Sequence, residues 1–138
     1  MRILCIDYGD ARIGVAVSDP MGWTAQMVET IRWREDITRP LNRIRELVGQ
    51  YGCKAIVVGL PRNMDGSAGP RELKTREFIK MLEDFIPEIE IKLWDERLTT
   101  VMAQRAMHDM GINAKNQKGR IDQMAAAFIL QGYLDSVK

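Results

Sequence analysis

The sequence predicts a three-layer α/β domain, with a mixed five-stranded sheet and helices on both faces. Two apolar segments, 2–7 and 12–19, are separated by only a short polar connection, which indicates an antiparallel hairpin. Residues 54–59 (KAIVVG) form an unbroken apolar run, typical of a strand buried on both faces of a parallel sheet. Apolar residues at helical spacing predict a helix on each side of this strand, over 36–51 and 70–85. Helices between parallel strands form right-handed crossovers.

The remaining elements follow from the same patterns. Alternation of apolar and polar residues predicts further strands at 27–33 and 89–94. Helical patterns predict two more helices, at 99–110 and 121–134. The expected order is three strands, a helix, a strand, a helix, a strand and two helices.

Two of these helices allow more detailed expectations. Asp36 or Thr38 can cap the start of the helix at 36–51, and Gly52 is expected to end it. The apolar residues of the helix at 70–85 are expected to face inward, namely Leu73, Phe78, Leu82 and Phe85.

Length and composition favour a single domain over residues 1–138, without membrane contact. The net charge is +1, which does not by itself indicate a nucleic-acid partner, although a balanced chain can carry a local basic face. No window approaches the roughly 18 apolar residues that a membrane span needs. A strand expected by the third residue leaves no room for a signal peptide, so we expect a cytoplasmic protein. Cys5 and Cys53 are expected to be buried and reduced.

Acidic residues occur where the predicted strands end. Asp7 follows the first strand, Asp95 and Glu96 follow the fifth, and Asp122 opens the last helix. Ligands of open α/β sheets collect at the carboxyl ends of the parallel strands. A carboxylate at the end of a buried strand is costly unless it is paired or binds a cation. The pattern therefore indicates a shared acidic cleft.

Hard oxygen ligands in such a cleft suit Mg²⁺ or Mn²⁺, and two such ions can act together on a phosphodiester. The small Gly9 would let a phosphate backbone come close. Structural interpretations stand beside this one. A carboxylate at position 122 also suits a helix N-terminus, and Asp95 and Glu96 could be surface charges at a turn.

Four segments in order, DYGDARIGVAVSD, VVGLPRNMDGSAGP, WDERLTT and IDQMAAAFILQGYL, are similar to motifs of the YqgF/RuvX family. The resemblance spans nearly the whole chain. It implies the ribonuclease H-like fold and a nuclease that resolves Holliday junctions or processes the ends of pre-16S ribosomal RNA. The resemblance also implies a metal site of Mg²⁺ or Mn²⁺, with two ions when substrate is bound.

The resemblance assigns roles to individual acids. Asp7 and Asp122 correspond to the first-strand and last-helix aspartates of the fold. Junction resolvases proper carry a glutamate at the end of the fourth strand, where this chain has Gly59. Glu96, with Asp95 beside it, resembles the family's DER motif and is expected to substitute. The expected catalytic residues are Asp7, Glu96 and Asp122, and the expected metal ligands are these three and Asp95.

Polar and basic residues near the acids are expected to contact the nucleic acid. Backbone N–H groups of the 60–70 loop can meet phosphate oxygens, although an Asp-Gly turn is also common without function. Arg12 and Arg97 either contact the scissile phosphate or pair with Asp7, Asp10 or Asp95. Arg71, Lys74 and Arg76 add positive charge near the loop. The expected substrate-binding residues are Gly9, Arg12, Arg62, Asn63, Asp65, Gly66, Ser67, Arg97, Lys115, Lys118 and Arg120.

Two other functions remain open at this level. The chain could bind nucleic acid or a ribosome-associated partner without cutting, because position 59 lacks an acid. The strand–Asp–x–Gly–strand hairpin also occurs in nucleotide-binding domains of the actin and Hsp70 type, but those proteins close two lobes around the nucleotide. The sequence leaves open the choice between RNA and DNA, and between a monomer and a homodimer.

Overall fold

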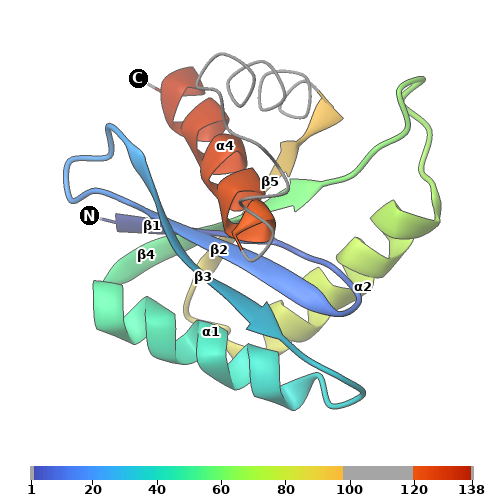
Figure 1. Cartoon of the computed structure of the whole chain (residues 1–138), viewed down its shortest axis with the longest axis horizontal. Coiled ribbons are helices and arrows are strands. Elements are labelled where there is room, and N and C mark those ends of the chain that lie inside the picture. Colours follow the sequence, from blue (N-terminus) through green and yellow to red (C-terminus); the bar gives the residue numbers. More distant parts are fainter. Residues whose placement is uncertain (1, 98–119, 138) are drawn as a thin grey trace.

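The computed structural model describes residues 2–97 and 120–137, and it confirms the predicted order of elements within them (Figure 1). The predicted helix at 99–110 lies outside the described residues. The strands are β1 (Arg2–Asp7), β2 (Arg12–Ser18), β3 (Ala25–Arg32), β4 (Cys53–Leu60) and β5 (Glu90–Asp95). The helices are α1 (Thr38–Tyr51), α2 (Pro70–Phe85) and α4 (Ile121–Ser136).

The strands form one mixed sheet in the order β3-β2-β1-β4-β5. β1 pairs antiparallel with β2 and β2 with β3, as the predicted meander requires. β4 pairs parallel with both β1 and β5, as crossovers through helices require. The carboxyl ends of β1, β4 and β5 therefore lie at one edge of the sheet.

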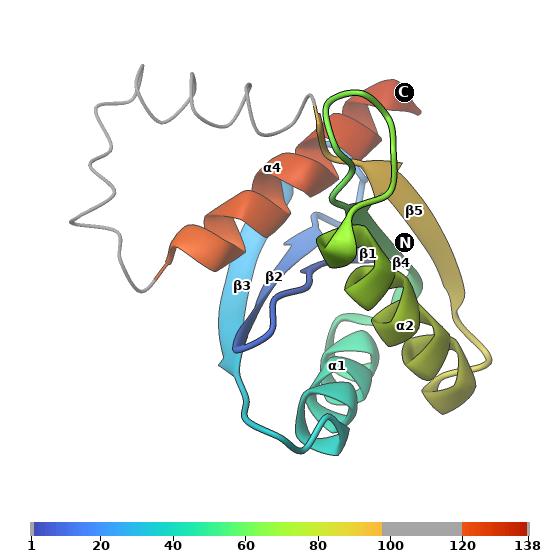
Figure 2. The same cartoon turned by 90° about the vertical axis from the view of Figure 1, so that its right-hand side faces the viewer.

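Helices cover both faces of the sheet, which confirms the three predicted layers (Figure 2). On one face, α1 and α2 bury apolar residues such as Ile44, Phe78 and Leu82 against the strands. On the other face, α4 packs across β1, β2 and β3 with Ile129 and Leu130 at its buried side. Alternate residues of the central strands serve the two faces, so each strand contributes to both cores.

The ends of α1 follow the expected chemistry with a small shift. Ile37 occupies the N-cap position, and the carboxylate of Asp36, two residues before the helix begins, accepts a hydrogen bond from the backbone N–H of Thr38 at 3.0 Å. Gly52 ends the helix in the left-handed conformation, with φ of 63°, which glycine adopts without steric cost. The cysteines at positions 5 and 53 are buried and free, as predicted.

The orientation predicted for one residue of α2 is wrong. Leu73 is 56% exposed, whereas the helix buries Glu72, Thr75 and Ile79 together with Phe78 and Leu82. The buried residues recur at helical spacing from Glu72 onward, through Thr75 to Leu82, so residue 73 falls beside this stripe on the solvent side. Within the described residues, no helix is long and apolar enough to cross a membrane.

Candidate nuclease site at the carboxyl edge of the sheet

Three carboxylates from distant parts of the chain lie at the carboxyl edge of the parallel strands. Asp7 is the last residue of β1, and Glu96 directly follows β5. The backbone N–H of Glu96 donates to the carbonyl oxygen of Leu60 at 3.3 Å, which ties the end of β5 to the end of β4. Asp122 is the second residue of α4, which crosses the sheet from the other face.

These carboxylates are close enough to influence one another. Burial raises the pKa of Asp7 from 3.8 to about 7, and repulsion from Glu96 and Asp122 adds to the rise. The positive charge of Arg71 acts in the opposite direction on the same pKa. Burial also raises the pKa of Glu96. Asp7 therefore sits among like charges that the protein only partly compensates.

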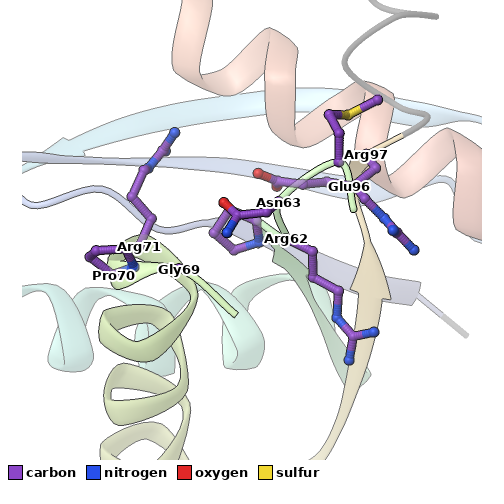
Figure 3. Close-up of a pocket in the computed structure, with 9 residues that line it drawn as sticks. Arg62, Asn63, Gly69, Pro70, Arg71, Glu96 and Arg97 are labelled. Atoms are coloured by element: carbon purple, nitrogen blue, oxygen red, sulfur yellow. The ribbon is translucent and has the colours of Figure 1, made fainter. Parts of the chain in front are cut away.

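Glu96 occupies the space above Gly59. A Cβ built at residue 59 would lie 2.6 Å from Oε2 of Glu96 and 2.7 Å from Cδ1 of Ile129. The chain thus brings a carboxylate from the end of β5 to the position where a side chain on β4 would start. Figure 3 shows this carboxylate pointing toward the side of Arg71, away from the guanidinium of Arg97.

We expect Gly59→Ala to displace Glu96 and to disturb the packing of α4. The added methyl group overlaps Ile129, and overpacking of this kind costs about 1–3 kcal/mol of unfolding free energy. Urea denaturation of the variant measures the loss. An unchanged unfolding midpoint would show that the side-chain ends of Glu96 and Ile129 move aside without a cost in stability.

Asp95 has a different environment from its neighbour. Its Oδ2 lies 2.6 Å from the guanidinium of Arg97, in a bidentate ion pair. The hydrogen bond from Arg97 holds the pKa of Asp95 below its usual range. Asp95 is not among the groups that raise the pKa of Asp7. The sequence left open whether Arg97 contacts phosphate or pairs with an acid, and in the structure it forms the ion pair with Asp95.

Asp122 is held by Arg12 and by the close approach of α4 to β2. The Nε of Arg12 lies 3.3 Å from Oδ2 of Asp122, so Arg12 pairs with this acid rather than with the partners expected from the sequence. Gly14 pairs with Asp7 in the hairpin, and a Cβ at residue 14 would overlap the carbonyl oxygen of Asp122. Glycine at this position is what lets the start of α4 reach the end of β1.

The acids do not form a ready-made metal cage as their side chains stand. Within residues 2–97 and 120–137, no three His, Cys, Asp or Glu side chains are grouped closely enough to hold one metal ion. The chemistry of the three carboxylates nevertheless suits a hard dication, because their repulsion at Asp7 is relieved by positive charge. The metal site stays a prediction.

A cleft of about 440 Å³ opens beside Glu96, between the loop after β4 and the start of α2. Arg62, Asn63, Arg71 and Arg97 supply its polar lining (Figure 3). The cleft brings together several of the residues that were expected to bind substrate, and its cationic lining suits a phosphate backbone.

The loop that borders this cleft is closed by its own hydrogen bonds. The backbone N–H of Asn63 donates to the carbonyl oxygen of Ser67 at 3.2 Å, and Gly66 has φ of 87°. The Oδ1 of Asp65 accepts hydrogen bonds from the N–H and the hydroxyl of Ser67. Asp65 and Ser67 therefore shape the loop, whatever contacts they make with a substrate.

A second, smaller cleft of about 150 Å³ lies beside the β1–β2 turn. It is lined by Tyr8, Gly9, Asp10, Arg71, Lys74 and Thr75. A Cβ at Gly9 would lie 2.5 Å from the carbonyl oxygen of Arg12, so the turn itself requires glycine there. The expected approach of phosphate at Gly9 stays a prediction.

The basic stretch before α4 is described only at its last residue. Arg120, the residue before the helix, is exposed, and its Nη2 lies 4.0 Å from the sulfur of Met27. Lys115 and Lys118 lie outside the described residues.

Sequence reasoning gave too little weight to two residues at this edge. Glu72 is buried, and its carboxylate forms ion pairs with Arg62 at 3.7 Å and with Arg76 at 2.9 Å. Within the described part of the chain, its Oε1 has no hydrogen-bond partner. Arg71 faces both clefts. A sequence clue existed for Arg71, because a cation in the first turn of a helix opposes the helix dipole and therefore suggests another role.

Comparison with known proteins identifies relatives over almost the full length. The family model described as "RuvX: Holliday junction resolvase" matches residues 1–136. A protein of Acetivibrio thermocellus named "Putative pre-16S rRNA nuclease" is 60% identical over 136 residues, covering 99% of this chain and 96% of the relative. A protein of the same name from Ruminiclostridium cellulolyticum is 52% identical over 137 residues, covering 99% and 96%.

The structure supports the same assignment at the level of fold. RuvC of T. thermophilus in complex with a Holliday junction substrate superposes with a TM-score of 0.67 at 15% identity, covering 99% of this chain and 95% of that one. A second structure of Thermus thermophilus RuvC gives a TM-score of 0.59. These similarities confirm the ribonuclease H-like fold. Together with the full-length family match, they show that the chain belongs to the RuvX family of nucleases, described as Holliday junction resolvases.

Proposed function

We propose that this protein hydrolyses phosphodiester bonds of structured nucleic acid in a reaction that requires Mg²⁺ or Mn²⁺. The substrates we propose are the ends of pre-16S ribosomal RNA, Holliday junctions or both. The observation that carries the proposal is the electrostatic coupling of Asp7 with Glu96 and Asp122. Three segments that are remote in the sequence deliver these acids to one edge of the sheet, beside a cationic cleft.

Asp7, Glu96 and Asp122 would hold the divalent cation. Asp95 is the weaker candidate as a ligand, because Arg97 already neutralises it. A divalent cation in such a site promotes attack by water and neutralises the charge that develops on the leaving oxygen.

The protein's own residues would bind and orient the nucleic acid for hydrolysis. In that reaction the oxygen of water forms a new bond to phosphorus while one P–O ester bond breaks, and the leaving oxygen takes up a proton. The 440 Å³ cleft would receive the backbone between Arg62 and Arg71. The roles of the other predicted substrate-binding residues follow the same proposal: Gly9, Arg12, Asn63, Asp65, Gly66, Ser67, Arg97, Lys115, Lys118 and Arg120.

A module that binds nucleic acid without cutting is the alternative. Its support was the missing acid at position 59, and this support weakens because the Glu96 carboxylate reaches the space above Gly59. The family match over residues 1–136 favours the nuclease over a nucleotide-binding domain of the actin type.

The decisive experiment offers the protein two substrates side by side in Mn²⁺, a synthetic four-way junction and a precursor 16S RNA fragment. We expect cleavage of at least one substrate, and we expect Asp122→Asn to reduce it by on the order of a hundredfold, because the variant loses a proposed ligand charge. Gel analysis of the products reports the substrate class.

Two controls make the result interpretable. EDTA should stop cleavage by the wild-type protein, and Asp84→Asn, an exposed change of equal charge on α2, should leave it unchanged. Binding of both substrates without cleavage in Mg²⁺ and Mn²⁺ would support the non-catalytic alternative instead. Symmetric paired cuts in the junction would indicate a homodimer, which sedimentation velocity tests independently.

A further inference from the structure

Arg71 is the one described residue that lines both clefts at the carboxyl edge of the sheet. It shares the 440 Å³ cleft with Glu96 and Arg97, and the 150 Å³ cleft with Tyr8 and Gly9. Its side chain rises from the first turn of α2, on the side toward which the Glu96 carboxylate points (Figure 3). Arg71 therefore stands where the two clefts adjoin.

The other basic residues that line these clefts are already engaged in ion pairs. Arg97 binds Asp95 at 2.6 Å and Lys74 binds Asp10 at 3.2 Å, while Arg62 lies 3.7 Å from Glu72. Among the residues that the structure describes, Arg71 has no carboxylate within 4.0 Å of its guanidinium nitrogens. With respect to residues 2–97 and 120–137, its hydrogen-bond donors are thus available to a ligand.

The position of Arg71 is unfavourable for stability alone. It is the second residue of α2, and a cation there faces the positive end of the helix dipole. The negative charges of Asp7 and Glu96 compensate it from a distance, since Arg71 lowers the pKa of both. A cation held near acids but not paired with them suits an anion that binds at the same edge.

We propose that Arg71 binds the phosphodiester backbone of the substrate where the two clefts adjoin. A guanidinium can donate two parallel hydrogen bonds to phosphate oxygens, which gives direction as well as charge. The inference rests on the nuclease function proposed above, and it gives Arg71 a direct phosphate contact, where the sequence predicted only added positive charge near the loop. The backbone would pass from the loop side of Glu96 toward the β1–β2 turn.

Binding measured without cleavage tests this role. We would place Arg71→Ala and Arg71→Lys in an Asp7→Asn background and titrate labelled four-way junction and precursor RNA at several KCl concentrations. Arg71→Ala should weaken binding by about tenfold to a hundredfold, the range for a hydrogen bond to a charged group. It should also make the plot of log association constant against log [KCl] less steep, by about 0.7 for single strands or 0.9 for duplex DNA. Arg71→Lys keeps the charge, so it should keep the slope while losing part of the affinity.

Lys80→Ala is the matched control, because it removes one positive charge from an exposed position of α2 that lines neither cleft. Its affinity for nucleic acid and its salt slope should equal those of the parent, which is the protein carrying Asp7→Asn alone. If thermal unfolding shows that Arg71→Ala is not folded, Arg71→Gln replaces it.

The two possible failures are distinguishable. Salt slopes that are equal for Arg71→Ala and Lys80→Ala, in a parent that binds nucleic acid, would overturn the role of Arg71 alone. A parent and a wild-type protein that bind neither substrate would overturn the proposed function, and this inference with it.

Discussion

Asp7→Asn is expected to abolish cleavage and, in the absence of metal, to make the folded protein more stable at pH 8. The loss of cleavage should be on the order of a hundredfold or more, because several kcal/mol of charge stabilisation depend on the metal ligands. The gain in stability has a separate cause, which is the raised pKa of the buried Asp7 carboxyl. Cleavage assays and metal-free urea denaturation measure the two effects independently.

The pH dependence of the stability gain follows from that pKa. The unfolded chain releases the Asp7 proton near pH 3.8, whereas the folded protein keeps it up to about pH 7. The folded state therefore binds more protons in this window, so the contribution of Asp7 to stability is fully present below pH 3.8 and falls as the pH rises to about 7. Asparagine does not ionise, so the variant does not lose stability in this way as the pH rises. The variant's advantage should reach at most about 4 kcal/mol at pH 8 and vanish near pH 4.

Asp95→Asn provides a control of opposite sign. Because Arg97 lowers the pKa of Asp95, the wild-type residue contributes stability above its unfolded pKa, and this contribution is lost as the pH falls. The Asp95→Asn variant should therefore gain no stability at pH 8.

Added Mg²⁺ should raise the melting temperature of the wild type more than that of Asp7→Asn. Cleavage at the wild-type rate by Asp7→Asn would refute the proposed site.

Gly14→Ala is expected to destabilise the protein and to impair the site. The new Cβ would overlap the carbonyl oxygen of Asp122, which is backbone and cannot turn aside as a side chain does. The start of α4 must shift away from β2 and carry Asp122 with it. We expect a loss of at least about 1–3 kcal/mol of unfolding free energy, the usual cost of overpacking. The cleavage rate should fall by more than the loss of folded protein accounts for, because the proposed metal ligands separate.

Gly49→Ala shows whether this result depends on the site. Gly49 lies within α1, where a Cβ meets nothing within 4 Å. Alanine should stabilise this helix by about 0.5–1 kcal/mol and leave cleavage unchanged. Equal effects of the two substitutions on unfolding would mean that α4 does not depend on a glycine at residue 14.

The position of the proposed site was predictable from the pattern of strands, and the partners of its residues were not. Asp7 and Glu96 could be expected at one edge because parallel strands align their carboxyl ends, whereas Asp122 opens a helix and was assigned to the site by the family resemblance. Whether Asp95 or Glu96 faces the other acids stayed open in the sequence. The structure separates them, since Arg97 engages Asp95 while Glu96 reaches the space above Gly59.

The sequence by itself determined the order of strands and helices and the acids that follow strands β1 and β5, because periodicity and turn chemistry are local properties. Its four motifs carried the resemblance to the YqgF/RuvX family. Only the tertiary structure decided that Arg12 pairs with Asp122, that Leu73 faces solvent and that Arg71 lines two clefts at the edge of the sheet. These features depend on distances between segments far apart in the chain. Such distances are set by how closely two backbones approach, as α4 does at Gly14.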